Sequence, residues 1–131
     1  MHAALQDAAR KAGLSSLIEQ KGWDYRCGEN GNQLSGGEKQ RIALARSILQ
    51  GTDVLFFDEV TSALDAKTGH QIMETIQNMT EKTRIVITHD IYPELMDSFD
   101  AVLVLEGGQL AEAGMFSDLI AKTGRLLPSG E

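Results

Sequence analysis

The residues best suited to chemistry begin where a helix is predicted to start. Ser35, Gly36 and Gly37 precede Glu38, and the three-residue spacing of Ser35 and Glu38 is that of a capping box. Such a helix N-terminus carries unpaired backbone N–H groups and the positive end of a dipole, and glycines offer no Cβ to obstruct an approaching phosphate. Ser35 adds a hydroxyl donor. The segment predicts a phosphate-binding loop, with a plain capping box as the alternative.

Two carboxylates follow a continuous apolar run. Residues 54–57 are typical of a strand buried on both faces, and Asp58 and Glu59 come directly after it. The carboxyl ends of parallel strands are where α/β sheets bind ligands. There Asp58 can hold Mg²⁺ through water, because Mg²⁺ keeps much of its hydration shell, and Glu59 can polarise an attacking water. Two solvated acids that cap a strand end are the alternative.

Ser62, Asp65 and His89 complete the set of candidate residues. Ser62 and Asp65 lie in Thr61–Asp65, where Asp65 can also act simply as a helix cap. His89 follows an apolar run at 85–87, and an imidazole at a strand end can donate to a phosphate and hold Glu59 and water in place. An ordinary surface histidine is the alternative for His89.

The elements that position these residues follow from hydrophobic periodicity. The predicted helices cover 3–20 with a break at Gly13, 36–50 with Ser35 as cap, a segment around 72–79 capped by Asp65, and 117–122. The predicted strands are 54–57, 85–87 and 102–105, followed by a hairpin turn at 106–109 that leads into 110–113. The order strand, helix, strand predicts an α/β fold with a mainly parallel sheet.

Composition limits the classes of protein to consider. The 131 residues carry 19 acidic and 12 basic side chains, a formal net charge of −7, which argues against a nucleic-acid partner. Cys27 is the only cysteine, so an intramolecular disulfide is excluded. No apolar run approaches the roughly 18–20 residues of a membrane-spanning helix. The length suits one domain or a piece of one.

In order and spacing, these segments resemble the ATP-binding cassette (ABC) ATPases. Leu34–Arg41 resembles the signature motif of that family, residues 54–59 its Walker B strand, Thr61–Asp65 its D-loop, and His89 its switch histidine. Residues 43–46 and 102–114 extend the resemblance over essentially the whole chain. It implies a partial P-loop NTPase fold, a mainly parallel sheet flanked by helices. Residues 1–50 would be the end of the helical subdomain and 51–131 the C-terminal part of the α/β core.

The resemblance also implies ATP and Mg²⁺ as ligands, in a site shared by two ATPase domains that face each other head to tail. Within that site the implied catalytic residues are Glu59 and His89, and the implied Mg²⁺ residue is Asp58. The implied ATP-contacting residues are Ser35, Gly36, Gly37 and Glu38, toward the ATP of the opposing domain, and Ser62 and Asp65 of the D-loop.

Two details resemble the exporter branch of the family. Gly28–Gly31 resembles the loop by which exporter ATPase domains touch their transmembrane domain, although Arg26 stands where an acid is usual. Val60 occupies a position where many import systems have proline. The resemblance thus implies an ATPase that drives export at the cytoplasmic face of a membrane, with a transmembrane domain as partner.

The chain contains no G-x-x-x-x-G-K-[ST] phosphate loop. We therefore expect the C-terminal portion of an exporter ATPase domain, which alone neither binds ATP tightly nor hydrolyses it, because positioning is most of phosphoryl-transfer catalysis. The strands would leave an apolar edge exposed, which predicts self-association.

Two alternative functions remain open from the sequence. The C-terminal lobe of a chromosome-maintenance or DNA-repair ABC ATPase would share the Leu-Ser-Gly-Gly-Glu-Lys string, but no coiled-coil heptads precede residue 34 and the charge is acidic. The second alternative is a non-catalytic module that offers its signature face to a complete partner. The intact motifs disfavour this alternative. No residue pattern indicates the transported substrate.

Overall fold

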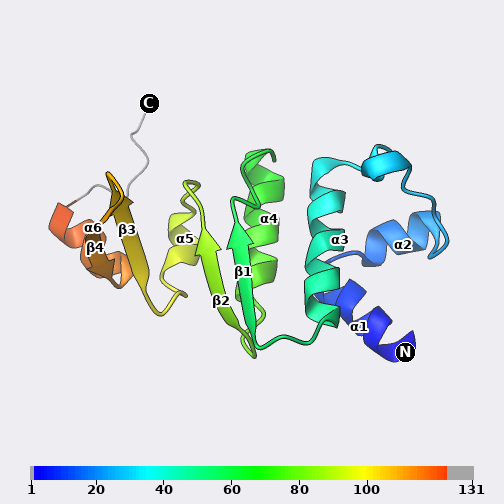
Figure 1. Ribbon diagram of the computed structural model, residues 1–131, viewed down its shortest axis with the longest axis horizontal. Helices are drawn as coiled ribbons and strands as arrows, with labels where there is room; N and C mark the ends of the chain where they lie inside the picture. Colours follow the sequence, from blue (N-terminus) through cyan, green and yellow to red (C-terminus); the bar gives the residue numbers. More distant parts are fainter. Residues whose placement is uncertain (1, 124–131) are drawn as a thin grey trace. The chain divides into compact units, whose positions relative to one another are not determined.

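The computed structural model describes residues 2–123 as two compact units, one ending at Thr88 and the other beginning at His89 (Figure 1). The last residues of the predicted 51–131 region lie outside this range. The first unit consists of α1 (His2–Lys11), α2 (Ser15–Lys21), a 3₁₀ turn (Glu29–Gly31), α3 (Gly36–Leu49), β1 (Val54–Asp58), α4 (Ala66–Gln77) and β2 (Thr83–Ile87). The second consists of α5 (Pro93–Met96), β3 (Val102–Glu106), β4 (Gln109–Gly114) and α6 (Phe116–Thr123).

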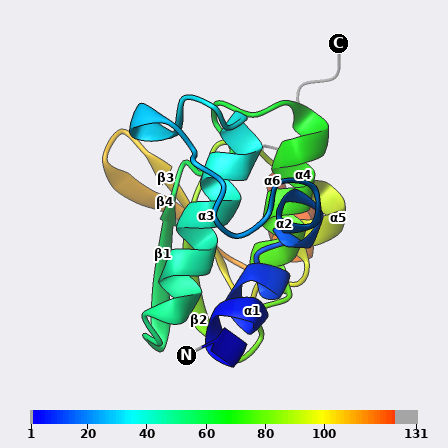
Figure 2. The same cartoon turned by 90° about the vertical axis from the view of Figure 1, so that its right-hand side faces the viewer.

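Helices α1 and α2 are separated at Gly13, as the sequence predicts. Gly13 has φ +72°, a left-handed conformation that glycine adopts without steric cost. The buried face of α1 is formed by Ala8 and Ala9, with Ala12 just beyond its end. These small side chains let α1 pack closely against α3 (Figure 2).

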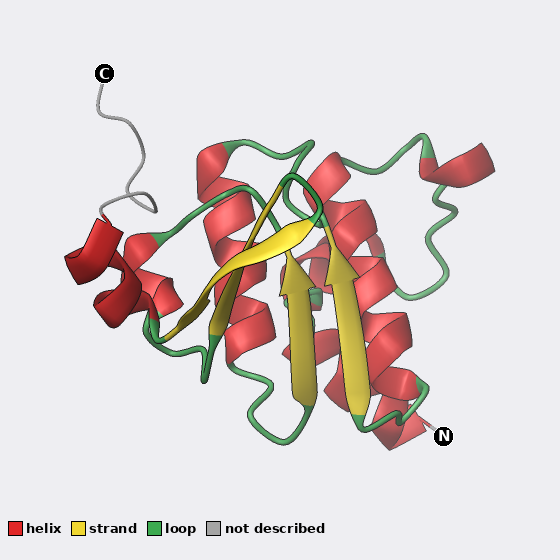
Figure 3. Ribbon diagram, turned by 60° about the vertical axis from the view of Figure 1, so that its left-hand side comes forward, coloured by secondary structure: helices red, strands yellow, loops and turns green. Residues whose placement is uncertain are grey.

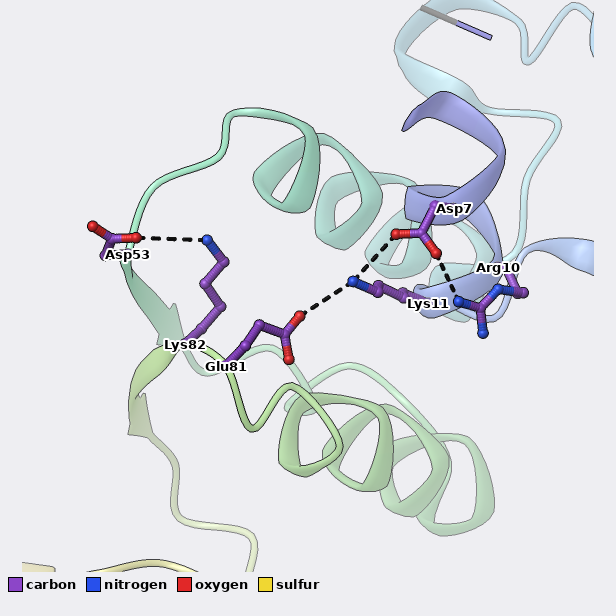
Figure 4. A network of polar contacts seen from close by, with 6 residues as sticks. All are labelled: Asp7, Arg10, Lys11, Asp53, Glu81 and Lys82. Carbon is purple, nitrogen blue, oxygen red and sulfur yellow. Dashed lines mark hydrogen bonds and ion pairs between the residues drawn. The ribbon is translucent and has the colours of Figure 1, made fainter. Parts of the chain in front are cut away.

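A polar network on the surface ties α1 to the turn before β2 (Figure 4). Lys11 Nζ lies 3.2 Å from Asp7 Oδ2 and 3.3 Å from Glu81 Oε1, and Arg10 Nη2 lies 2.6 Å from Asp7 Oδ1. Hydrogen bonds from Arg10 and then from Lys11 lower the pKa of Asp7, and the bond to Asp7 raises the pKa of Lys11. A separate pair nearby joins Lys82 Nζ and Asp53 Oδ1 at 3.9 Å.

Strands β1 and β2 pair in parallel, with Phe56 opposite Ile85 and Asp58 opposite Ile87. Figure 3 draws them as two neighbouring arrows that point the same way, with helices behind them. On the face covered by α3 and α4, Leu55 and Phe57 are buried together with Ile72, Met73 and Ile76 of α4. This face is the core of the first unit.

The prediction that these strands are buried on both faces is wrong. Val54 and Phe56 are 46% and 70% exposed, and Ile85 and Ile87 of β2 are 41% and 52% exposed. Because side chains alternate along a strand, these four residues share the face opposite the helices. Among the described residues of this unit, no element covers that face. The apolar run of β1 is therefore buried on one side only, although such runs are typical of strands covered on both faces.

The second unit is built on an antiparallel hairpin. Strands β3 and β4 pair around the predicted turn at 106–109, with an irregularity between Val104 and Leu105. Among the described strands the sheets are therefore one parallel pair and one antiparallel pair, and the expectation of a mainly parallel sheet that includes 102–105 is wrong. Helix α6 packs on β4, and its Ser117 N–H donates to Asp97 Oδ1 at 3.1 Å.

Candidate functional site

The loop before α3 forms the capping box that the sequence predicts. Ser35 Oγ accepts a hydrogen bond from Glu38 N–H at 3.2 Å, and Glu38 Oε2 accepts one from Ser35 N–H at 2.8 Å. The Glu38 carboxylate thus holds Ser35 in place. The donors that the helix end can offer to an anion are the N–H groups of Gly36 and Gly37, since the first turn of a helix has no intrahelical acceptors for them. The Ser35 hydroxyl proton adds a third.

The two glycines also have a packing role that the sequence analysis did not find. A Cβ at Gly36 would lie 3.0 Å from Leu64 Cδ2, and a Cβ at Gly37 would lie 2.6 Å from Thr68 Cγ2. The absent side chains therefore allow the start of α3 to sit directly against the start of α4. Contacts between segments about thirty residues apart leave no periodic signal in the sequence, so this role was not predictable from spacing.

Asp65 caps α4 through both carboxylate oxygens. Its Oδ1 accepts from Thr68 N–H at 3.0 Å and its Oδ2 accepts from Thr68 Oγ1 at 2.7 Å. The hydrogen bond from the Thr68 side chain is the main reason that the pKa of Asp65 is lowered. Ser62 Oγ donates to the Glu59 carbonyl at 3.0 Å, which tightens the turn between β1 and α4. The ATP contacts of Ser62 and Asp65 stay predictions.

Asp58 and Glu59 occupy different environments although they are adjacent. Asp58 ends β1, is exposed, and shares the open face with Phe56. Glu59 has φ +51°, which is uncommon for a residue with a side chain. Its N–H donates to the Ile87 carbonyl at 2.8 Å, and its Oε2 is shielded from solvent. The two carboxylates thus differ in their exposure to solvent, and the separate roles of Asp58 and Glu59 stay predictions.

The structure brings Gly36 next to Leu64 and Gly37 next to Thr68, on either side of Asp65 in the sequence, because the N-termini of α3 and α4 lie side by side (Figure 1). His89 begins the second unit. Its side chain is 70% exposed, and its Nε2 lies 3.7 Å from Asp90 Oδ1. The action of His89 on Glu59 and water stays a prediction.

The residues at the end of β1 suit Mg²⁺ held mainly by water and phosphate. Within residues 2–123, no three His, Cys, Asp or Glu side chains come together in a way that would hold a metal ion. Asp58 is an exposed carboxylate, and Mg²⁺ usually takes one or two carboxylates with waters and substrate phosphates; the Mg²⁺ role of Asp58 stays a prediction.

A pocket of about 130 Å³ lies between α3, β1 and α4. It is lined mainly by apolar residues, among them Leu44, Phe56, Phe57, Val60 and Ile72. Pockets for small molecules usually measure about 300–1,000 Å³, so this one is too small for a nucleotide. Among the described residues, no helix has the length and the apolar composition needed to cross a bilayer.

Comparison with known proteins agrees with the motif order. The family profile described as "ABC transporter" matches residues 2–62. The Glutathione/L-cysteine transport system ATP-binding/permease protein CydC of Escherichia coli is 39% identical over 123 residues, covering 93% of this chain and 21% of that protein. The ATM1-type heavy metal exporter of Novosphingobium aromaticivorans is 41% identical over 125 residues, covering 93% and 20%.

A solved structure of a bacterial Atm1-family ABC exporter with ATP bound superposes with a TM-score of 0.81 at 37% identity, covering 96% of this chain and 22% of that one. The chain thus spans about a fifth of the length of these relatives. These likenesses agree with the family that the signature loop and the strand-end carboxylates indicate. The chain belongs to the ABC transporter family as part of an ATPase domain of the exporter type.

Proposed function

We propose that the chain is the C-terminal part of the nucleotide-binding domain of an ABC exporter, which couples ATP binding and hydrolysis to transport across a membrane. The observation that carries this proposal is the side-by-side placement of two capped helix N-termini, in which Gly36 and Gly37 of α3 pack against Leu64 and Thr68. The end of α3 offers the N–H groups of Gly36 and Gly37 and the positive end of its dipole, which suits a phosphate, whereas the Thr68 N–H of α4 is already bound by Asp65.

The site is completed by a second ATPase domain in a head-to-tail dimer. Ser35 Oγ and the N–H groups of Gly36 and Gly37 donate to the γ-phosphate of the ATP that the opposing domain holds. Asp58 is the residue that would hold Mg²⁺, and the ion, when bound, would supply positive charge beside the phosphates. Glu59 and His89 orient the attacking water. In phosphoryl transfer, such positioning and charge stabilisation account for most of the catalysis.

The isolated chain is inactive in this proposal. It has no phosphate loop to hold the β- and γ-phosphates. The partners of the complete protein are a second ATPase domain and a transmembrane domain, with the ATPase domain at the cytoplasmic face of the membrane. The acidic net charge of −7 supports the absence of a nucleic-acid partner.

Calorimetric titration with ATP tests whether the chain can bind nucleotide without a phosphate loop. The 131-residue chain is expected to show no micromolar binding, whereas the complete protein binds ATP and hydrolyses it. Micromolar ATP binding by the chain alone would overturn the dependence on a phosphate loop outside it. A complete protein without ATP hydrolysis, or one retained on DNA at physiological salt, would overturn the transporter function.

A further inference from the structure

Arg41 lies on α3 and connects that helix to two other elements of the first unit. Its Nη2 donates to Gln71 Oε1 of α4 at 3.2 Å. Its Nη1 donates to the carbonyl of Ala12, just beyond the end of α1, at 3.4 Å. The carbonyl end of a helix carries partial negative charge, so a guanidinium at the end of α1 is electrostatically favoured. One half-buried side chain therefore contacts the C-terminal end of α1 and the exposed flank of α4.

The break between α1 and α2 leaves the space that this guanidinium occupies. A Cβ at Gly13 would lie 2.3 Å from Arg41 Nη1, so the guanidinium packs directly against the backbone of the break. Ala12, whose carbonyl accepts the bond, is fully buried. The guanidinium thus has two acceptors, one of them the carbonyl of a buried residue.

The contact between Arg41 and Gln71 repeats, one helical turn along, the contact between Gly37 and Thr68. Arg41 follows Gly37 by four residues on α3, and Gln71 follows Thr68 by three on α4. Since an α-helix has 3.6 residues per turn, the two pairs lie in successive layers of the same helix–helix contact. The Gly37–Thr68 layer limits how closely the ends of α3 and α4 approach. The Arg41–Gln71 layer restrains how the two helices slide and rotate relative to each other.

We propose that Arg41 is a positioning residue for ATP hydrolysis, because it sets the placement of Ser35, Gly36 and Gly37 relative to the D-loop. This inference rests on the proposed function. Arg41 touches no phosphate itself; it acts through the N-terminus of α3. The planar guanidinium donates to Ala12 and Gln71 at the same time in fixed directions, and a lysine ammonium cannot span both acceptors in that geometry.

The effect falls on turnover rather than on ATP affinity. Ser35, Gly36 and Gly37 reach an ATP molecule that the phosphate loop of the opposing domain already holds. Misplacing them therefore leaves that primary site intact and weakens only the contacts that complete the closed dimer. A residue that merely stabilised the fold would instead change ATP affinity, turnover and melting temperature together.

The test is steady-state ATP hydrolysis by the complete protein, with ATP affinity measured separately in the presence of EDTA. We expect Arg41→Ala, which loses both hydrogen bonds of the guanidinium, to lower kcat about tenfold with the ATP dissociation constant unchanged. Arg41→Lys should recover part of kcat. Gln71→Ala, which changes an exposed side chain, should lower kcat less, and the Arg41→Ala/Gln71→Ala double variant should match Arg41→Ala alone.

Arg10→Ala is the matched control, because Arg10 is 68% exposed and pairs with Asp7 of the same helix. It should hydrolyse ATP at the wild-type rate. Wild-type kcat in Arg41→Ala, or parallel loss of kcat, ATP affinity and melting temperature, would overturn the role of Arg41 while the proposed function stands. A wild-type complete protein without ATP hydrolysis would overturn the proposed function and this role with it.

Discussion

Gly37 and Thr68 approach so closely that a Cβ at Gly37 would lie 2.6 Å from Thr68 Cγ2. This contact joins the N-terminus of α3, the proposed phosphate-binding end, to the first turn of α4, where Thr68 also donates to the cap Asp65. One side-chain methyl and one missing Cβ thus set the spacing of the two helix ends. The geometry of the proposed ATP-contacting surface follows from this spacing.

Gly37→Ala should destabilise the chain, although alanine favours a helix over glycine. Forcing a methyl group into a filled contact costs about 1–3 kcal/mol, which exceeds the gain in helix propensity of about 1 kcal/mol. Thr68→Ser removes the opposing Cγ2 and keeps the hydroxyl that bonds Asp65, so the double variant should regain most of the loss. Urea unfolding followed by circular dichroism measures both.

Gly36→Ala serves as the comparison, since its Cβ would meet the flexible end of Leu64 at 3.0 Å and make only ordinary contact with the Ala63 carbonyl at 3.9 Å. Its destabilisation should be smaller than that of Gly37→Ala. Equal stability of Gly37→Ala and wild type would show that α3 and α4 are not in close contact there.

Ser35 combines a capping role and a proposed phosphate contact, and substitutions separate the two. Ser35→Ala removes the oxygen that accepts from Glu38 N–H and should lower the free energy of unfolding by about 1 kcal/mol. Ser35→Asp keeps a capping oxygen and should restore stability. In the complete protein, however, Ser35→Asp should hydrolyse ATP more slowly than Ser35→Ala, because its carboxylate repels the γ-phosphate. ATP hydrolysis by Ser35→Asp at the wild-type rate would remove Ser35 from the site.

Stability should fall in acid because three carboxyl groups have lowered pKa values. The Thr68 side chain lowers the pKa of Asp65, Arg10 lowers that of Asp7, and a backbone hydrogen bond followed by Lys11 lowers that of Glu81. Their contribution is complete above the unfolded pKa values of about 3.9–4.3 and is lost as pH falls through the lower folded values.

For Lys11, the pH dependence of the contribution to stability runs in the opposite direction. Its pKa is raised by Asp7, so its contribution is present below the unfolded value of about 10.4 and is lost as pH rises through the folded value.

Melting temperatures measured from pH 2 to 7 should decline at the acid end, and Asp65→Asn should flatten that decline. The same acid slope in Asp65→Asn as in wild type would contradict the assignment for Asp65.

The open face of β1 and β2 should drive self-association of the chain. Phe56 is 70% exposed and lies beside Ile85 in the register of the strands. Phe56→Ser should shift sedimentation of the chain toward monomer, because it removes the largest apolar side chain from this face. Leu5→Ser, on α1 and 36% exposed, is the matched control and should sediment like wild type. A wild-type chain that is monomeric at high concentration would contradict the prediction.

Local signals in the sequence predicted the helix ends well, because capping depends on residues three apart. Ser35 with Glu38, and Asp65 before α4, form the caps that their spacing indicates. The hairpin turn at 106–109 is of the same kind, since its geometry is set by neighbouring residues. The short helix α5 was not predicted, because four residues that begin at Pro93 are too few to give a periodic pattern.

Burial and long-range contact were the features that sequence reasoning could not give. The apolar run 54–57 indicates a strand but not which of its faces is covered, because coverage depends on elements distant in the sequence. Phe56 lies on the uncovered face and is exposed. For the same reason the packing of Gly37 on Thr68 and the contacts of Arg41 emerge only in three dimensions. The positive φ of Glu59 is likewise a product of the turn that ends β1.

The central claim is that Glu59 orients the water that attacks ATP in a head-to-tail dimer, and Glu59→Gln in the complete protein tests it most directly. The amide keeps the size of the side chain and removes its charge. We predict that hydrolysis is lost while ATP still binds, so that the ATPase domains sediment as an ATP-bound dimer that wild type forms only transiently. Glu19→Gln, an exposed residue of α2, should leave hydrolysis unchanged. Normal turnover in Glu59→Gln, or loss of hydrolysis without an ATP-bound dimer, would contradict the account.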